Sequence, residues 1–205
     1  MIQIETTSHD PYFNQAFEDY VFRTYREGDV LLLWRNRPAV VVGCYQNICR
    51  EVHMRALLDR GIPVVRRMSG GGTVYHDLGN LNYTLISDQT GRSTTTAVWS
   101  RSSGPALNAL GVPAQKNRTC DIAVDGKKIS GSAQKIAGGR VLHHGTLLFD
   151  SDLSLLDEIT TGRKNDAFCS KGTESAICTV TNLRPYLKDD CEIVTFAKRL
   201  AGALL

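Results

Sequence analysis

The sequence has no long apolar run and no excess of charge of either sign. No stretch of the 205 residues is apolar for long enough to cross a bilayer, and Met1 to Glu5 lack the basic and apolar regions of a signal peptide. The net charge is +3, from 24 basic and 21 acidic residues that are interspersed, so charge gives no argument for a nucleic-acid partner. We therefore expect a cytoplasmic protein that binds neither membranes nor nucleic acid.

The six cysteines lack C-x-x-C spacing, which argues against a structural zinc site or a dithiol redox motif. Without an export signal they are expected to be reduced thiols. Cys120 stands out because it directly precedes Asp121 and is close in sequence to Lys128. A free cysteine is more often a small, inert core residue, so a nucleophilic role for Cys120 is kept as an alternative.

Helical and strand patterns interleave irregularly, without internal repeats or low-complexity linkers. Asp10 followed by Pro11 is typical of a helix start. The apolar runs 30–34 and 39–43 flank a polar stretch and predict a hairpin, and Asp125-Gly126 predicts a second one. The chain is long enough to bury a full core. We predict an α+β fold, with a mixed, mostly antiparallel sheet and helices packed on it.

Residues 66–80 combine two arginines, three consecutive glycines and a histidine. Glycine loses the most entropy on folding, so three in a row indicate backbone that touches a ligand or adopts positive φ. Arg67 could pair with a carboxylate or a phosphate through its planar fork. No helix start follows the glycines, so this is not the dinucleotide-binding fingerprint. A plain turn is the alternative, but Arg67 before the glycines and His76 after them favour a ligand site.

A second candidate segment begins at Asp121, which could hold Mg²⁺ together with substrate phosphates or could be an ordinary strand-start acid. Lys127 and Lys128 should face opposite sides of a strand, and the inward one needs an anion. From the two lysines alone, the favoured interpretation is that both only decorate a hairpin. The small residues that would leave room for a ligand here are Ser130, Gly131, Ser132 and Ala133.

Four segments carry a family resemblance. They are RRMSGGGTVYHDLGN at 66–80, DGKKISGSAQ at 125–134, HHGTLL at 143–148 and VTNL at 180–183. In this order they resemble the lipoate–protein ligase A family, whose superfamily includes octanoyltransferases and biotin–protein ligases. The resemblance implies the α+β scaffold shared with biotin ligases and class II aminoacyl-tRNA synthetases. We expect a single catalytic domain over residues 1–205; the lack of the small C-terminal accessory domain that such ligases often carry would be a departure from the family pattern.

The resemblance implies a two-step reaction. Lipoic acid and ATP, with Mg²⁺, give lipoyl-adenylate. The lipoyl group then passes to a lysine of a lipoyl domain in a 2-oxoacid dehydrogenase complex, or of the glycine-cleavage H protein. A separate accessory protein is a further candidate partner. Two alternatives stay open: an ATP-independent octanoyl or lipoyl transferase, and a non-catalytic module that binds lipoate or a lipoyl domain.

The resemblance also implies roles for the matching residues. Lys128 would be catalytic, contacting the acyl carbonyl and the adenylate phosphate. Asp121 would support the magnesium ion, and His144 would border the acyl pocket. The remaining residues expected to bind lipoate and the adenylate are Arg67, Ser69, Gly70, Gly71, Gly72, His76, Ser130, Gly131 and Ala133.

Overall fold

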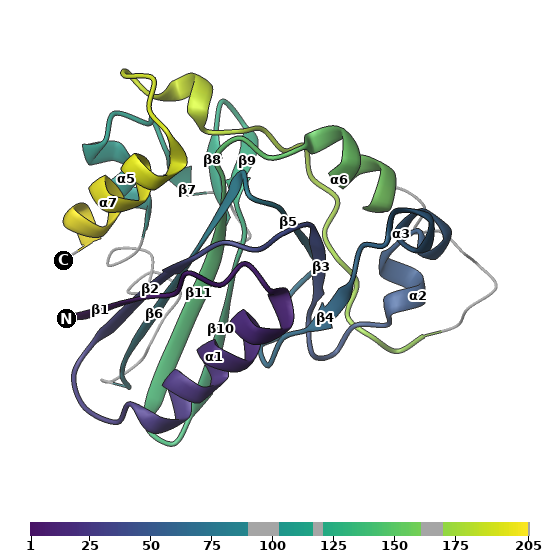
Figure 1. Cartoon of the computed structure of the whole chain (residues 1–205), viewed down its shortest axis with the longest axis horizontal. Helices are drawn as coiled ribbons and strands as arrows, with labels where there is room; N and C mark the ends of the chain where they lie inside the picture. The colour runs from purple at the N-terminus through teal and green to yellow at the C-terminus, as the bar shows by residue number, and fades with distance from the viewer. Residues whose placement is uncertain (90–102, 117–120, 161–169, 205) are drawn as a thin grey trace.

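The computed structural model describes residues 1–89, 103–116, 121–160 and 170–204. Their strands form one five-stranded and two three-stranded sheets, with helices packed around them (Figure 1). Two strand pairings among them are parallel, β1 with β2 and β3 with β4, and the others are antiparallel. The predicted α+β fold with a mixed, mostly antiparallel arrangement is therefore confirmed.

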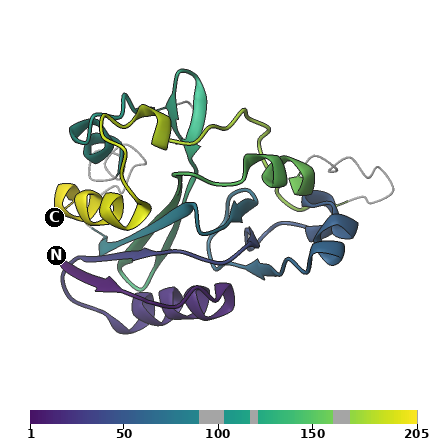
Figure 2. The same ribbon diagram turned by 45° about the horizontal axis from the view of Figure 1, so that its top comes forward.

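The five-stranded sheet is covered on both faces. Its order is β1 (Ile2–Glu5), β2 (Val30–Trp34), β6 (Asn80–Asp88), β11 (Arg140–Leu148) and β10 (Ser132–Ala137). Alternate side chains of β2 point to opposite faces of the sheet. Leu32 packs in the cluster beneath α1 (Pro11–Thr24), whereas Leu31 packs in the cluster that includes α7 (Ile193–Leu204). Figure 2 shows α1 on one side of this sheet and α7 on the other. Burial on both faces explains why β2 is apolar throughout.

The predicted start of α1 is confirmed by its cap. The carboxylate of Asp10 accepts hydrogen bonds from the backbone N–H groups of Tyr12 (3.0 Å) and Phe13 (2.9 Å), and Pro11 occupies the first turn. These contacts satisfy helix donors that would otherwise lack partners. The cap fixes where α1 begins, and thereby which of its side chains face the sheet.

The predicted hairpin between residues 30–34 and 39–43 is wrong. β3 (Ala39–Val42) lies in the second sheet, whose order is β4 (Val64–Arg66), β3 and β5 (Val74–His76). β2 already has β1 and β6 on its two edges, so it has no free edge for β3. The second sheet instead packs its apolar side chains against three helices: α2 (Ile48–Glu51), α3 (Met54–Arg60) and α6 (Leu153–Thr160).

The third sheet contains the predicted Asp125-Gly126 hairpin, which is confirmed. Its order is β7 (Gln115–Lys116), β8 (Ile122–Val124) and β9 (Lys127–Ser130). Asp125 and Gly126 both have positive φ, 50° and 74°, as a two-residue hairpin turn requires. The backbone of Lys128 bonds to a later segment, donating to Thr179 O and accepting from Thr181 N, both at 2.9 Å. β9 is therefore fixed on both sides.

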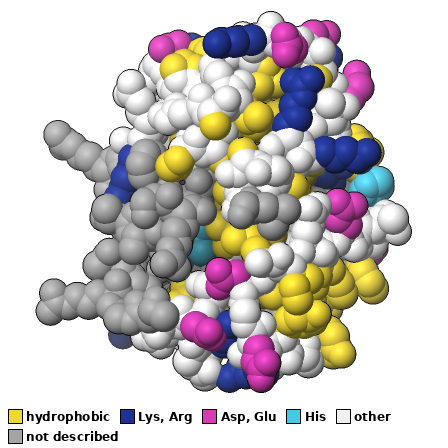
Figure 3. Space-filling view, turned by 90° about the vertical axis from the view of Figure 1, so that its left-hand side faces the viewer, with side chains coloured by type: hydrophobic (Ala, Val, Ile, Leu, Met, Phe, Trp, Pro, Cys, Tyr) yellow, Lys and Arg dark blue, Asp and Glu magenta, His cyan; other side chains and the backbone are white. Residues whose placement is uncertain are grey.

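The remaining described helices are α5 (Ser103–Ala109) and the short 3₁₀ helix η1 (Arg184–Tyr186). On the face seen in Figure 3, Lys and Arg side chains and Asp and Glu side chains are both present. No helix in the described part of the chain is long and apolar enough to cross a membrane.

Candidate active site

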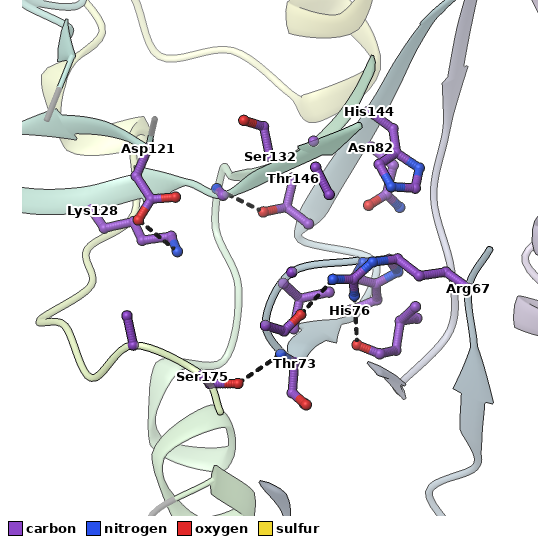
Figure 4. Close-up of a pocket in the computed structure, with 18 of the residues that line it drawn as sticks. Arg67, Thr73, His76, Asn82, Asp121, Lys128, Ser132, His144, Thr146 and Ser175 are labelled. Atoms are coloured by element: carbon purple, nitrogen blue, oxygen red, sulfur yellow. Dashed lines mark hydrogen bonds and ion pairs between the residues drawn. The ribbon is translucent and has the colours of Figure 1, made fainter. Parts of the chain in front are cut away.

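A cavity of about 260 Å³ is lined by residues of all three sheets and by the segment 173–176. In Figure 4, Lys128 and Asp121 lie at one end of it, and Arg67, His76 and His144 lie at the other. Of the residues singled out from the sequence, ten line the cavity: Arg67, Gly71, Gly72, His76, Asp121, Lys128, Gly131, Ser132, Ala133 and His144. Ser69, Gly70 and Ser130 are not among the lining residues.

Lys128 is the inward-facing lysine of the pair. Its Nζ lies 3.0 Å from Asp121 Oδ2, and the two side chains are 22% and 11% exposed. Lys127, one residue earlier on β9, is exposed. A Cβ on Gly131 would lie 2.9 Å from Lys128 Nζ, so the glycine leaves room for the ammonium group. The expectation that the inward lysine has an anion beside it is confirmed.

Arg67 binds the glycine segment that follows it. Its Nη2 donates to the carbonyl oxygens of Gly70 (2.7 Å) and Gly72 (2.6 Å), and its Nε donates to Ser69 Oγ (3.0 Å). Gly71, between the two bonded carbonyls, has φ of 86°, which favours glycine. Burial lowers the pKa of Arg67 to about 10, opposed by Glu18 and Cys44. The guanidinium stays charged at neutral pH and holds the loop that lines the cavity.

His76 is a neutral hydrogen-bond donor in the cavity wall. Asn14 Nδ2 donates to Asn36 Oδ1 (2.9 Å), which turns Asn36 Nδ2 towards His76 Nδ1 (3.0 Å). With Nδ1 accepting, the proton of the neutral ring is assigned to Nε2. That nitrogen is buried without a hydrogen-bond partner. Burial, reinforced by Arg67 and His144, lowers the pKa of His76 to about 3. The ring is therefore uncharged at neutral pH and carries a buried N–H without a hydrogen-bond partner.

The pKa values of His76 and His143 predict acid destabilisation. Burial is the main cause of both shifts, which lower each pKa to about 3. An unfolded histidine binds a proton near pH 6.5, whereas these folded ones do not until about pH 3. Stability is therefore fully present above pH 6.5 and is lost as the pH falls, by about 1.4 kcal/mol per pH unit per histidine.

Urea unfolding between pH 7.5 and 5 measures this effect. The slope of the unfolding free energy against pH reports how many more protons the unfolded state binds than the folded state. In His143→Gln this number should be lower by about one, because one buried histidine is removed. A flat wild-type profile over this range would contradict the assignment.

A segment that the sequence motifs did not reveal closes one side of the cavity. Ser175 Oγ accepts from the backbone N–H of Thr73 (2.8 Å) and from Gln46 Nε2 (3.0 Å), and it donates to the carboxylate of Glu51. One hydroxyl thus ties residues 173–176 to the glycine segment and to α2. These residues are ordinary in type and distant in sequence, so no local pattern connects them.

Asn82 also lines the cavity and was not predicted. A usable signal exists on β6, because Asn80, Asn82 and Thr84 alternate with Leu81, Tyr83 and Leu85. All three polar residues are buried, at 2% exposure or less. Buried polar residues with period two mark a strand face that borders a polar site.

The cavity offers few metal ligands. No group of three or more His, Cys, Asp or Glu within the described ranges is arranged to bind a metal. Its carboxylates are Asp121 and Glu174, and Glu174 pairs with Arg50 at 2.8 Å. Magnesium at Asp121 would therefore need substrate phosphates and water as its other ligands, which is usual for this ion. Cys120 lies outside the residues that the structure describes.

The chain belongs to the family of the lipoyl protein ligase A/B catalytic domain, whose model matches residues 10–205. The resemblance drawn from the sequence motifs is confirmed. Among curated relatives, the lipoate-protein ligase LplJ of Bacillus subtilis (strain 168) is 39% identical over 198 residues. That match covers 94% of this chain and 58% of the relative, so the chain spans little more than half of that protein's length.

Solved structures show the same fold. A bi-partite lipoate protein ligase from Thermoplasma acidophilum, described with its E2 lipoyl domain, superimposes with a TM-score of 0.81 at 24% identity. The match covers 98% of this chain and 80% of that one. A lipoate-protein ligase A bound with ATP gives a TM-score of 0.78 at 24% identity, covering 99% of this chain and 81% of that one. At this identity, the likeness establishes the fold.

Proposed function

We propose that the chain activates lipoate with ATP to lipoyl-adenylate and transfers the lipoyl group to a lysine of a lipoyl-domain protein. The observation that carries the proposal is that Lys128, 3.0 Å from Asp121, lines the same cavity as the glycine segment held by Arg67. The family supports it, as do the lipoate-protein ligase relative and the folds of the ATP-bound ligase and of the ligase with an E2 lipoyl domain.

The proposed chemistry uses the two ends of the cavity. In the first step, the lipoate carboxylate attacks the α-phosphate of ATP, and pyrophosphate leaves. In the second, the acceptor lysine amine attacks the acyl carbonyl, and AMP leaves. Lys128 stabilises the negative charge that develops on phosphate and carbonyl oxygens. The acyl chain lies among the apolar lining residues Trp34, Val41, Val74 and Ala133.

Asp121 orients the Lys128 ammonium and is the residue that would hold Mg²⁺ with the substrate phosphates. Bound magnesium would neutralise phosphate charge during activation. Two finer parts of the proposal rest on the motif resemblance: the glycine-cleavage H protein as acceptor and a separate accessory protein as partner. A cytoplasmic location is proposed from the composition of the chain.

Lipoate-dependent exchange of labelled pyrophosphate into ATP tests the activation step. The proposal predicts exchange that requires both lipoate and magnesium. The assay is run with the chain alone and with an added accessory protein, and exchange under either condition supports the activation step. A carrier-dependent transferase would show no exchange but would transfer acyl groups from an acyl carrier protein. A binding module would do neither. The variant Cys120→Ala should retain exchange and transfer, because the proposed mechanism uses no cysteine nucleophile.

A further inference from the structure

We infer that Glu18 of α1 is a positioning residue for the acyl end of the cavity. Glu18 does not line the cavity, yet it is connected by hydrogen bonds to three side chains that do: Trp34, His144 and Arg67. The inference rests on the proposed function for the identity of the ligand. It assigns the geometry of the acyl site to a buried carboxylate behind its wall.

Glu18 has the burial expected of such a group. Glu18 is 1% exposed and lies on the same buried helix face as Asn14 and Val21. A carboxylate in this position is costly unless it is hydrogen-bonded and has a countercharge. Its Oε1 accepts two side-chain hydrogen bonds, while Oε2 is buried without one. The carboxylate therefore depends strongly on those two bonds.

The first bond leads to Trp34. Thr84 Oγ1 donates to Glu18 Oε1 at 2.5 Å, and Trp34 Nε1 donates to Thr84 Oγ1 at 3.2 Å. An indole nitrogen can only donate and an ionised carboxylate can only accept, so the direction of this chain is determined. The orientation of the Trp34 ring in the cavity wall is thereby coupled to the position of the Glu18 carboxylate.

The second bond leads through His144 to the glycine segment. His144 Nδ1 lies 2.8 Å from Glu18 Oε1 and must donate to it, so Nε2 of the neutral ring accepts from Ser69 Oγ at 2.6 Å. Ser69 Oγ in turn accepts from Arg67 Nε at 3.0 Å. Glu18 thus fixes the tautomer of His144, the first residue of this hydrogen-bond chain. The last residue of the chain, Arg67, binds the carbonyl oxygens of the glycine loop through Nη2.

Glu18 also supplies countercharge. The hydrogen-bond acceptors of the Arg67 side chain are neutral, namely carbonyl oxygens and the Ser69 hydroxyl. The charge of Glu18 opposes the effect of burial on the Arg67 pKa, and it is the largest opposing cause. Removing the carboxylate charge therefore disfavours the charged form of the guanidinium that shapes the loop.

Three variants separate the hydrogen-bonding position of the Glu18 side chain from its negative charge. Glu18→Gln keeps an oxygen that can accept both bonds but removes the charge. Glu18→Asp keeps the charge but withdraws it by one methylene. Glu18→Ala removes both. Losing hydrogen bonds to a charged group changes binding by about 10- to 100-fold. We expect the KM for lipoate to rise by about that factor in Glu18→Ala and by less in Glu18→Gln. We expect kcat to change less than KM, because Lys128 lies at the other end of the cavity.

The matched control is Asp19→Ala, which removes the neighbouring half-buried carboxylate and its surface pair with Arg23. Its KM should equal that of the wild type. A double variant tests whether Glu18 acts through the hydrogen bonds that connect His144, Ser69 and Arg67. It combines Glu18→Ala with Ser69→Ala, which removes the hydroxyl between His144 and Arg67. If Glu18 acts through that chain, the double variant should raise KM by clearly less than the product of the two single effects.

A KM unchanged in the Glu18 variants, with only a lower melting temperature, would overturn the inference and leave Glu18 a structural residue. If the KM increase in the double variant equals the product of the two single increases, Glu18 does not act through His144 and Ser69. Failure of the wild-type chain to transfer lipoate would instead overturn the proposed function. Calorimetric titration of lipoate into the same variants would then decide the positioning role, because weaker binding in Glu18→Ala supports it and equal binding overturns it.

Discussion

Lys128→Ala is expected to lower the rate of lipoyl transfer by about 10²- to 10³-fold, the loss typical of removing one group that stabilises developing charge. Its ammonium lies beside Asp121 at one end of the cavity, where the proposed mechanism places the acyl carbonyl and the phosphate. The fold should remain intact, because β9 is held by the backbone bonds of residue 128 to Thr179 and Thr181 and not by its side chain.

Transfer rates from steady-state kinetics, with melting temperatures measured alongside, provide the test. The matched control is Lys127→Ala, which removes the adjacent but exposed lysine of the same strand and should leave the rate unchanged. Near-normal turnover by Lys128→Ala, or equal losses in the two variants, would show that the charge of Lys128 is not used in the chemistry.

Gly71→Val is expected to abolish measurable binding of a non-hydrolysable lipoyl-adenylate analogue. Gly71 has φ of 86°, and a Cβ there would lie 3.1 Å from Arg67 Nη2 and 3.5 Å from the Ala133 Cβ. A valine would therefore push against the guanidinium that holds the loop and would extend into the cavity, in addition to its backbone strain of about 1–2 kcal/mol.

Gly139→Val is the matched control for that strain. Gly139 has φ of 75° in the turn between β10 and β11, and a Cβ there would meet nothing within 4 Å. Both variants should lose stability, but the Gly139 variant should bind the analogue as tightly as the wild type in calorimetric titration. Unchanged affinity in Gly71→Val would mean that the three glycines form only a turn.

The local features of the fold could be predicted from the sequence because their causes are local. Asp10 caps α1 through atoms within three residues, and Asp125-Gly126 adopts a turn that two adjacent residues determine. The partner of β2 could not be predicted in this way. Its apolar run pairs with β1 and β6, and that choice depends on which edges are free once the whole chain has folded.

The candidate site shows the same division. Arg67, Lys128 and Asp121 stand in recognisable motifs, and the structure places all three at one cavity. Glu18 and Ser175 act through hydrogen bonds to residues 126 and 124 positions away, respectively, which no local pattern encodes. A partial signal existed for Glu18, because a charged residue within the buried stripe of a helix requires partners.

Transfer from chemically prepared lipoyl-adenylate to a lipoyl domain is the decisive measurement for the ligase assignment, since it needs neither ATP nor an accessory protein. We expect the chain to move the lipoyl group to the domain's lysine and to release AMP. Lys127→Ala should do the same, and Lys128→Ala should not. Failure of the wild-type chain to use the adenylate, combined with transfer from an acyl carrier protein, would contradict the ligase assignment.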